Sequence, residues 1–286
     1  MKAMKSLVTV DWLAQHLDDE TVRVVDIRGR VLPPSEPLPH YYAHREAYEA
    51  AHIPGAVFVD WTTDIVEPGS PSQDILNAED FGRLMGRLGI GAGTQVVAYD
   101  DADGMFAARL WWALRYYGHE SVAVLDGGWK LWTARGLPTT AEVVQPHEAS
   151  FIPRVNAGLR QTSATVSQRT ADTALVDVRS PAEFRGEVSR ARRRGHIPGA
   201  VNVPRTALVN PDGTLKAPDE LRQLFVDAGV RLESPAVIAY CNAGVSASYG
   251  LLALEAAGFR QASIYDGSWK DWGNDENLPV EPAGSA

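Results

Sequence analysis

Short apolar runs alternate along this chain with longer segments in which apolar residues recur at helical spacing. In the first half, the runs that predict strands lie near 23–27, 57–59, 95–99 and 122–125, and helical spacing lies near 78–88 and 107–117. In the second half, the strand-like runs lie near 174–178, 201–203, 237–240 and 263–265, and helical spacing lies near 218–228 and 247–257. Short apolar runs bounded by turn residues are typical of strands that are buried on both faces. The pattern therefore predicts an α/β fold with mainly parallel sheets flanked by helices.

Four segments of the first half recur in the same order in the second half. Val24–Arg28 matches Leu175–Arg179, His52–Val57 matches His196–Val201, Val97–Asp100 matches Ile238–Cys241, and Leu125–Trp132 matches Tyr265–Trp272. The chain is thus an internal repeat of two halves of about 140 residues, a common size for one domain. For residues that occur in both halves, such as His52 and His196, a structural role is favoured over a catalytic role.

The repeat predicts two α/β domains in tandem. We expect a first domain at 1–140, a linker at 141–162 and a second domain at 163–286. The stretch between the halves contains Pro146 and Pro153, few large apolar residues and no helical period, which is typical of a linker.

The only cysteine of the chain, Cys241, stands where the apolar run 237–240 ends. A loop of small residues follows it and leads into a predicted helix. Unpaired backbone N–H groups and the positive end of the dipole gather at a helix N-terminus, and a thiol that faces them ionises more readily. A lone cysteine is also often a buried, inert core residue. From this stretch alone both interpretations stay open.

Composition limits the classes of function. The chain has 286 residues, 45% hydrophobic and 22% charged, which is ordinary for a globular protein. A formal net charge of −9 argues against general binding to nucleic acid or to anionic membranes. A single cysteine excludes an intramolecular disulfide and suits a reducing compartment. We find no signal-peptide pattern and no apolar run long enough to span a bilayer, so the cytoplasm is the expected location.

The repeated His-Ile-Pro-Gly-Ala, the Asp-Gly-Gly/Ser-Trp run and the Cys-x-x-Gly-x-Ser loop together resemble the tandem-domain rhodanese family of sulfurtransferases. The resemblance covers nearly the whole chain and implies two tandem rhodanese-like domains. In that family the second domain carries the catalytic cysteine. Asp100 stands where the second half has Cys241, which implies that the first domain is not catalytic.

The resemblance implies that Cys241 is a nucleophile that carries a sulfane sulfur as a persulfide between a donor and an acceptor. The loop residues would hold the charged sulfur with backbone N–H groups. These substrate-binding candidates are Asn242, Ala243, Gly244, Val245, Ser246 and Ala247. Ser246 is expected either to donate a further hydrogen bond or to be the N-cap of the following helix. No metal or organic cofactor is required. The implied partners are a small anionic sulfur donor and, as acceptor, cyanide, a small thiol or a thioredoxin-like protein.

The loop bears on the identity of the donor. Thiosulfate-type vertebrate rhodaneses tend to carry basic residues after the cysteine, and mercaptopyruvate-type enzymes tend to carry Gly-Ser-Gly-Val-Thr. The present loop is neutral, but Ala243 replaces the serine of the second pattern. The segment 60–64 looks more like thiosulfate-type bacterial tandem rhodaneses. Thiosulfate is therefore the expected donor, and 3-mercaptopyruvate is the alternative.

Glu183 departs from the family pattern, which tends to place an arginine just before Phe184. A replacement cation that binds the anionic tail of the donor is sought among the nearby arginines. These are Arg185, Arg190, Arg192, Arg193 and Arg194. Arg185 is the best candidate, since it lies closest to the pattern position. Each of these arginines also fits a solvated basic loop.

Two other functions compete with sulfur transfer. Rhodanese domains resemble the cell-cycle dual-specificity phosphatases, which place an arginine six residues after the cysteine. Ala247 stands there, and no arginine lies between Asn242 and Gly258. Without it a phosphoryl group has no bidentate partner, so we reject this function. The other competitor is a non-catalytic sulfur- or partner-binding module whose loop no longer turns over.

Overall fold

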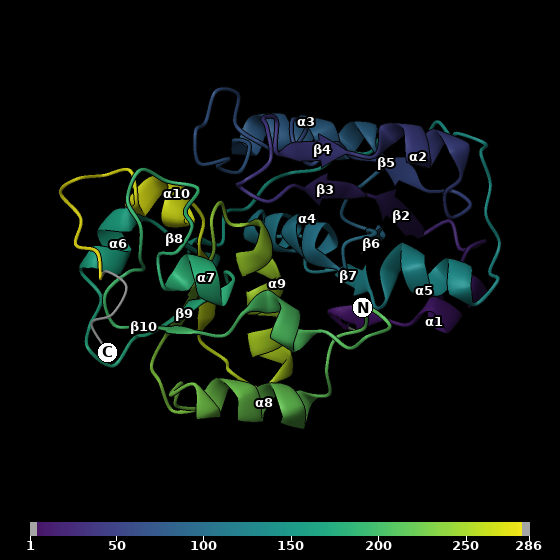
Figure 1. Cartoon of the computed structure of the whole chain (residues 1–286). Helices are drawn as coiled ribbons and strands as arrows, with labels where there is room; N and C mark the ends of the chain where they lie inside the picture. Colours follow the sequence, from purple (N-terminus) through teal and green to yellow (C-terminus); the bar gives the residue numbers. More distant parts are fainter. Residues whose placement is uncertain (1–4, 282–286) are drawn as a thin grey trace. The chain divides into compact units, whose positions relative to one another are not determined.

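A computed structural model of the chain describes residues 5–281 (Figure 1). It divides into two compact units. The first contains the chain up to Pro68, Ile75–Asn156 and Asn210–Thr214, and the second contains Gly69–Asp74, Ala157–Val209 and the chain from Leu215 onward. Each unit has a sheet of its own.

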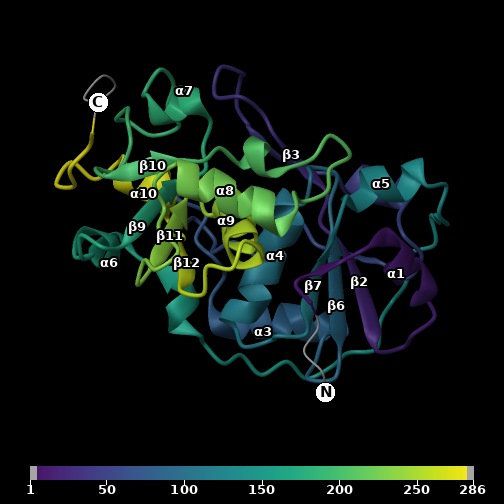
Figure 2. The ribbon, with the colours of Figure 1, turned by 90° about the horizontal axis from the view of Figure 1, so that it is seen from below.

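The first unit is built on a five-stranded parallel sheet. Its strands are β1 (Leu7–Val8), β2 (Val22–Asp26), β5 (Val57–Phe58), β6 (Gln95–Tyr99) and β7 (Val122–Leu125). Its helices are α1 (Val10–Gln15), α2 (Arg45–Ala50), α3 (Ala78–Arg87), α4 (Met105–Tyr116) and α5 (Gly128–Ala134). The strand order is β1-β7-β6-β2-β5, and β7, β6 and β2 can be followed side by side in Figure 2. A short antiparallel pair, β3 (Gly29–Val31) and β4 (Tyr41–Ala43), stands apart from this sheet.

Alternation along the strands divides the apolar side chains of this unit between two faces. Val24 and Val97 pack in one buried cluster with residues of α1, α2 and α5. Their neighbours Val25 and Val96 are also buried, and they point to the opposite face because successive side chains of a strand alternate. The helix α4 packs against β6 and β7. A strand buried on both faces is apolar throughout, and this explains the continuous apolar runs of the sequence.

The second unit repeats this arrangement. Its strands are β8 (Arg160–Gln161), β9 (Ala174–Asp177), β10 (Ala200–Asn202), β11 (Val237–Tyr240) and β12 (Ala262–Tyr265). Its helices are α6 (Ser163–Ser167), α7 (Pro181–Phe184), α8 (Pro218–Asp227), α9 (Val245–Ala256) and α10 (Ser268–Trp272), with 3-10 turns η1 (Ala157–Leu159) and η2 (Arg205–Leu208). The order β8-β12-β11-β9-β10 matches that of the first sheet strand for strand, and all pairs are parallel.

In this unit β11 lies at the centre of the sheet, between β9 and β12. The helix α9 packs on β11 and β12, and α8 packs on α9. Trp269 and Trp272 of α10 belong to a buried cluster that includes Ile238 and Tyr240 of β11. The end of β11 is therefore held by packed side chains.

The predicted α/β fold with two mainly parallel sheets is confirmed. The predicted strands and helices all form, with ends displaced by at most two residues. The sequence pattern missed the edge strands β1 and β8, the antiparallel pair β3 and β4, the 3-10 turns, and the short helices α1, α2, α5, α6, α7 and α10. The predicted linker 141–162 contains η1 and β8 at its end, and β8 pairs with β12. Within residues 5–281 no helix is both long and apolar enough to cross a membrane.

Candidate functional site

Cys241 leaves the sheet at the carboxyl end of β11. It is the first residue after the strand, and 4% of its surface is exposed. In open parallel sheets the carboxyl ends of the strands form the usual site of ligands and chemistry. The structure thus places the Cys241 thiol at the end of a strand, as the sequence predicted.

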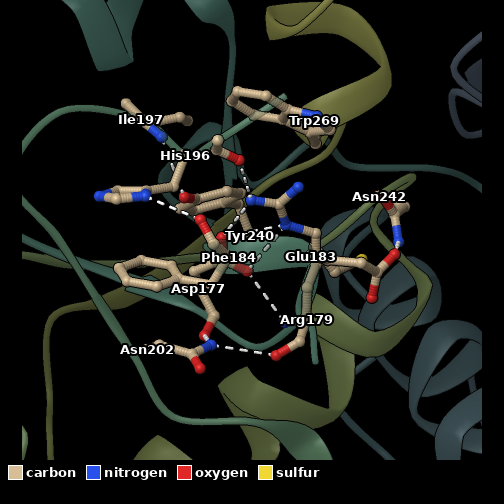
Figure 3. Close-up of polar contacts among 12 residues, drawn as sticks. Asp177, Arg179, Glu183, Phe184, His196, Ile197, Asn202, Tyr240, Asn242 and Trp269 are labelled. Atoms are coloured by element: carbon tan, nitrogen blue, oxygen red, sulfur yellow. Dashed lines mark hydrogen bonds and ion pairs between the residues drawn. The ribbon is translucent and has the colours of Figure 1, made fainter. Parts of the chain in front are cut away.

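A buried ionic network fixes the residue that precedes the thiol (Figure 3). The Arg179 Nε donates to both carboxylate oxygens of Asp177 at 3.0 Å, and Ile197 N donates to the Tyr240 hydroxyl at 3.2 Å. The Arg179 guanidinium lies 4.5 Å from the centre of the Trp269 ring. Burial opposes the charge of Arg179, but Asp177 raises the pKa of its guanidinium above the usual value. The same network, built by Asp26, Arg28 and Tyr99, occurs in the first unit, which supports a role in the fold.

The backbone carbonyls at the start of the loop are bound by the N-terminus of α10. Trp269 N donates to the carbonyl oxygen of Cys241 at 3.0 Å, and Lys270 N donates to that of Asn242 at 2.9 Å. These bonds turn the two carbonyl dipoles toward α10. An anion at the thiol is therefore not opposed by the oxygen atoms of these two peptide groups.

Ser268, which the sequence pattern did not single out, holds the loop through hydrogen bonds of its hydroxyl. Its hydroxyl accepts hydrogen bonds from Cys241 N at 3.1 Å and Gly244 N at 3.2 Å, and it donates to Tyr265 O at 2.7 Å. The Ser268 Oγ also lies 4.0 Å from the Cys241 Sγ. Ser268 is fully buried and has a φ of 55°, in the left-handed region. The repeat has glycine at this place, Gly128, so the Gly/Ser difference between the two halves was the available signal.

We expect Ser268→Ala to lower the free energy of unfolding by about 1–3 kcal/mol, because two buried N–H groups lose their acceptor. Reaction at the Cys241 thiol should slow by about tenfold, because the loop would lose its geometry around the thiol. Ser268→Gly is the matched control, since it removes the same acceptor but relieves the left-handed backbone. Denaturant titration and single-turnover mass spectrometry measure the two effects. A Ser268→Ala variant with the wild-type rate would contradict this role.

The helix α9 begins directly after the loop. Gly244 is its N-cap, with a φ of 73°, and the first bond within the helix runs from Ser248 N to Gly244 O at 3.0 Å. The expectation that Ser246 could be the N-cap is wrong, because α9 begins at Val245 and Ser246 lies in its first turn. The amides of a first turn have no acceptor within their helix and can bind an anion.

The first unit contains the same loop with a carboxylate in it. Asp100 is buried, and its Oδ1 accepts from Ala102 N at 2.8 Å and Gly104 N at 2.9 Å. Its Oδ2 accepts from Phe106 N at 2.6 Å and Ala107 N at 2.8 Å. Burial raises the pKa of Asp100, and the amides of Ala107, Ala102 and Gly104 act in the opposite direction. In this unit the loop and the first turn of α4 thus hold a carboxylate where the second unit has a thiol.

Glu183 contacts the candidate loop through Asn242 (Figure 3). The Asn242 Nδ2 donates to Glu183 Oε1 at 2.8 Å, and the Arg190 Nε lies 3.8 Å from the same oxygen. The other carboxylate oxygen, Oε2, accepts from Ser180 Oγ at 2.8 Å. The position where the family pattern has an arginine is therefore occupied by a carboxylate that binds the loop.

The five candidate arginines have different surroundings. Arg185 is 57% exposed at its side chain and pairs with the exposed Glu187 at 2.7 Å. The Arg193 guanidinium donates to carbonyl oxygens at and beyond the end of α10, including Trp272 O at 2.6 Å and Leu278 O at 2.6 Å. Arg192 N donates to Asn274, and Arg194 donates to Glu187 O. Arg190 is joined to the loop through Glu183, whereas the contacts of Arg185 lie away from the loop.

The two repeated histidines have equivalent structural contacts. The His52 Nδ1 lies 2.7 Å from Tyr48 O and the His196 Nδ1 lies 2.9 Å from Phe184 O, so each ring donates to a carbonyl oxygen in or at the end of a short helix. Each ring also stacks on the side chain of that same residue. In the described part of the chain, no three His, Cys, Asp or Glu side chains gather in a way that could hold a metal ion.

The sequence profile of the rhodanese-like domain matches this chain twice, at residues 9–135 and 162–275. A Thermus thermophilus protein named sulfur carrier protein TtuD is 36% identical over 96% of this chain and 95% of its own length. A Haloferax volcanii protein named putative thiosulfate sulfurtransferase is 36% identical over 96% of each chain.

A solved structure is similar over almost the same length. The crystal structure of SseA from Escherichia coli, a 3-mercaptopyruvate sulfotransferase with the rhodanese fold, matches with a TM-score of 0.82 and 34% identity. The match covers 93% of the present chain and 99% of SseA. The similarity therefore extends over both units.

Proposed function

The chain belongs to the rhodanese family of sulfurtransferases, and we propose that it moves a sulfane sulfur from a small anionic donor to cyanide or a thiol through a persulfide on Cys241. The observation that carries this proposal is the position of the only cysteine. It follows the central strand β11, its carbonyl oxygen is bound by α10, and the amides of the α9 N-terminus lie just beyond it in the loop. Such a loop favours the thiolate and the persulfide anion over their neutral forms.

The reaction has two half-reactions. The Cys241 thiolate attacks the outer sulfur of thiosulfate, the sulfur–sulfur bond of the donor breaks, and sulfite leaves with the bonding electron pair. The enzyme then holds the transferred sulfur as Cys241–S–S⁻. The acceptor then attacks this terminal sulfur, and the sulfur–sulfur bond to Cys241 breaks. Cyanide becomes thiocyanate, a thiolate becomes a persulfide, and the Cys241 thiolate is restored. This is a double-displacement cycle with a covalent intermediate, and it uses no cofactor.

Thiosulfate is the donor that we propose first, and 3-mercaptopyruvate is the alternative. With mercaptopyruvate the thiolate attacks the thiol sulfur, the carbon–sulfur bond breaks, and the enolate of pyruvate leaves and takes a proton. The relatives support both donors, since one is named a putative thiosulfate sulfurtransferase and another is a 3-mercaptopyruvate sulfotransferase. Ala243 and the segment 60–64 support thiosulfate over mercaptopyruvate, whereas the neutral charge of the loop is shared with the mercaptopyruvate pattern.

The first domain, 1–140, is proposed to be non-catalytic and to be joined by the linker 141–162 to a catalytic domain at 163–286. The four amide hydrogen bonds on Asp100 support this proposal. They fill the first loop with the protein's own carboxylate, which leaves no place for a sulfur anion. A carboxylate also cannot accept a sulfane sulfur as a thiolate does.

The donor's anionic tail is proposed to bind a guanidinium of the segment 185–194. Arg185 is closest to the family position, but the pairing of Arg190 with Glu183 at 3.8 Å favours Arg190. We expect Arg190→Ala to raise KM for thiosulfate by about tenfold with a smaller effect on kcat, and Arg185→Ala to change KM by less than about twofold. Steady-state kinetics with both variants measures this. A larger effect of Arg185→Ala would identify Arg185 as the cation.

The proposed acceptors are cyanide, a small thiol or a thioredoxin-like protein, and the proposed compartment is the cytoplasm. The single cysteine supports a reducing compartment. The net charge of −9 argues against nucleic acid as a partner.

A second candidate function is that of a sulfur carrier that is loaded but not discharged to small acceptors. The similarity to the Thermus sulfur carrier protein favours it.

Intact-mass spectrometry tests the proposal. The reduced protein is mixed separately with thiosulfate and with 3-mercaptopyruvate, and the mass is followed before and after cyanide. The proposal predicts one added sulfur per chain from thiosulfate, which cyanide removes. An adduct from mercaptopyruvate alone would change the donor, and an adduct that no small acceptor removes would favour the carrier. No adduct from either donor would exclude both assignments.

A further inference from the structure

A negative charge is held against the residue that follows the candidate nucleophile. The Glu183 Oε1 accepts from Asn242 Nδ2 at 2.8 Å, and Asn242 is the direct neighbour of Cys241 in the chain. The Glu183 side chain is 12% exposed, so water screens its charge only in part. A substrate that reaches Cys241 therefore approaches this carboxylate.

The capping box of α7 keeps the carboxylate in place. Ser180 is the N-cap, and its backbone N and its Oγ donate to Glu183 Oε2 at 3.2 and 2.8 Å. Glu183 N donates in return to Ser180 Oγ at 3.3 Å. Because each carboxylate oxygen has its own donor, Glu183 cannot turn away from the loop without breaking at least one of these bonds.

Glu183 also offsets the nearest positive charge. The Arg190 Nε lies 3.8 Å from Oε1, and its side chain is 10% exposed. A donor anion that binds Arg190 is attracted by the guanidinium and repelled by the carboxylate. The repulsion grows with each charge that the substrate carries, so a dianion is affected about twice as strongly as a monoanion at the same distance.

Glu183 sets the orientation of the Asn242 amide as well. A carboxylate only accepts hydrogen bonds, so the Asn242 Nδ2 must face it, and the Oδ1 is turned the other way. That oxygen is buried and has no hydrogen-bond donor among residues 5–281. The N–H donor of the Asn242 amide is thus turned to Glu183, and it does not serve as a hydrogen-bond donor for an anionic substrate.

We propose that Glu183 sets the charge selectivity of the site by disfavouring each negative charge that a substrate brings to Cys241. A doubly charged donor such as thiosulfate is then used at a raised KM, and cationic or neutral thiols are better acceptors than anionic thiols. The statement about substrates rests on the proposed function. The effect of the Glu183 charge on reagents that react with the Cys241 thiol does not rest on that function, and it can be measured without sulfur transfer.

Glu183→Gln is the variant that isolates the charge. Glutamine has one acceptor oxygen, so it keeps either the capping box with Ser180 or the bond from Asn242 Nδ2, and comparing two probes on the same variant separates the lost charge from the lost hydrogen bond. Glu187→Gln is the matched control, because it removes the same charge from a glutamate that is 54% exposed and pairs with Arg185. The probes are iodoacetate, an anion, and iodoacetamide, a neutral reagent of similar size. The ratio of their alkylation rates at Cys241 cancels any change in the fraction of thiolate.

We expect Glu183→Gln to raise the ratio of the iodoacetate rate to the iodoacetamide rate by about three- to tenfold at low salt. Glu187→Gln should change it by less than about twofold, because exposed charges are screened. On the persulfidated enzyme, Glu183→Gln should speed sulfur transfer to the anionic thiol 3-mercaptopropionate. It should slow transfer to the cationic thiol cysteamine. Both rates are taken relative to the rate with the neutral thiol 2-mercaptoethanol.

An unchanged alkylation ratio in Glu183→Gln would overturn the inference even if persulfide forms normally. A changed ratio in a protein that takes no sulfur from either donor would exclude the proposed function and leave the charge effect of Glu183 standing. A thiol that neither reagent alkylates would also overturn the inference, since an accessible Cys241 is its premise.

Discussion

Cys241→Ser is expected to abolish sulfur transfer, with a loss of at least about a thousandfold in kcat, as for other enzymes that lose their nucleophile. A serine hydroxyl stays protonated at neutral pH and does not attack a sulfane sulfur, whereas the thiolate does so readily. Because the chain has no other cysteine, no second thiol can take over the reaction. Thiocyanate production from thiosulfate and cyanide measures the loss.

The exchange of one atom at a 4% exposed position should leave the fold intact, so the variant must show the wild-type unfolding midpoint. Its intact mass should not change in the presence of thiosulfate or mercaptopyruvate. Measurable turnover by folded Cys241→Ser would contradict a persulfide mechanism, because sulfur would then reach the acceptor without this residue.

Arg179→Met is expected to lower the free energy of unfolding by about 3–5 kcal/mol, because it leaves the buried Asp177 carboxylate without its counter-ion. The guanidinium is held by Asp177 and by Gly195 O at 2.9 Å, and both ionic side chains are fully buried. Since Tyr240 is hydrogen-bonded to this network and precedes the nucleophile directly, activity should fall as well. Denaturant unfolding at neutral pH measures the stability.

The double variant Asp177→Asn/Arg179→Met is the control for this interpretation. It removes the unpaired charge but keeps an acceptor for the Tyr240 hydroxyl, so it should recover much of the stability that Arg179→Met loses. Arg28→Met is the equivalent change in the first unit, where Arg28 pairs with Asp26 at 2.9 Å. A loss of less than about 1 kcal/mol in Arg179→Met would show that the pair is not a main support of the sheet.

The fold could be predicted from the sequence because its local and long-range patterns agree. The run 237–240 is apolar throughout, as a central parallel strand requires, and the repeat supplied a second copy of every main strand. The edge strands β1 and β8 escaped prediction, since two residues are too short to show a period, whereas β5, which is equally short, follows a segment that recurs in the repeat. The position of Cys241 after β11 was readable because it lies where an apolar run ends.

The support of the candidate site was not readable in the same way, because it comes from residues far away in the chain. Ser268 lies 27 positions from Cys241, and it reaches the loop only because β12 returns beside β11. Glu183 and Asn242 are 59 positions apart, so the sequence showed the departure from the family pattern but not its partner. The sequence left Arg193 among the candidate cations, but the structure shows its guanidinium bound to carbonyl oxygens at and beyond the end of α10.

The most direct test of the persulfide mechanism is a single half-reaction. The protein is loaded with thiosulfate, freed from excess donor by gel filtration, and mixed with cyanide while mass and thiocyanate are followed. The mechanism predicts one thiocyanate per loaded chain and the return of the original mass, at a rate no slower than steady-state turnover. Thiocyanate that forms only when thiosulfate is present, while the added sulfur stays on the protein, would contradict it.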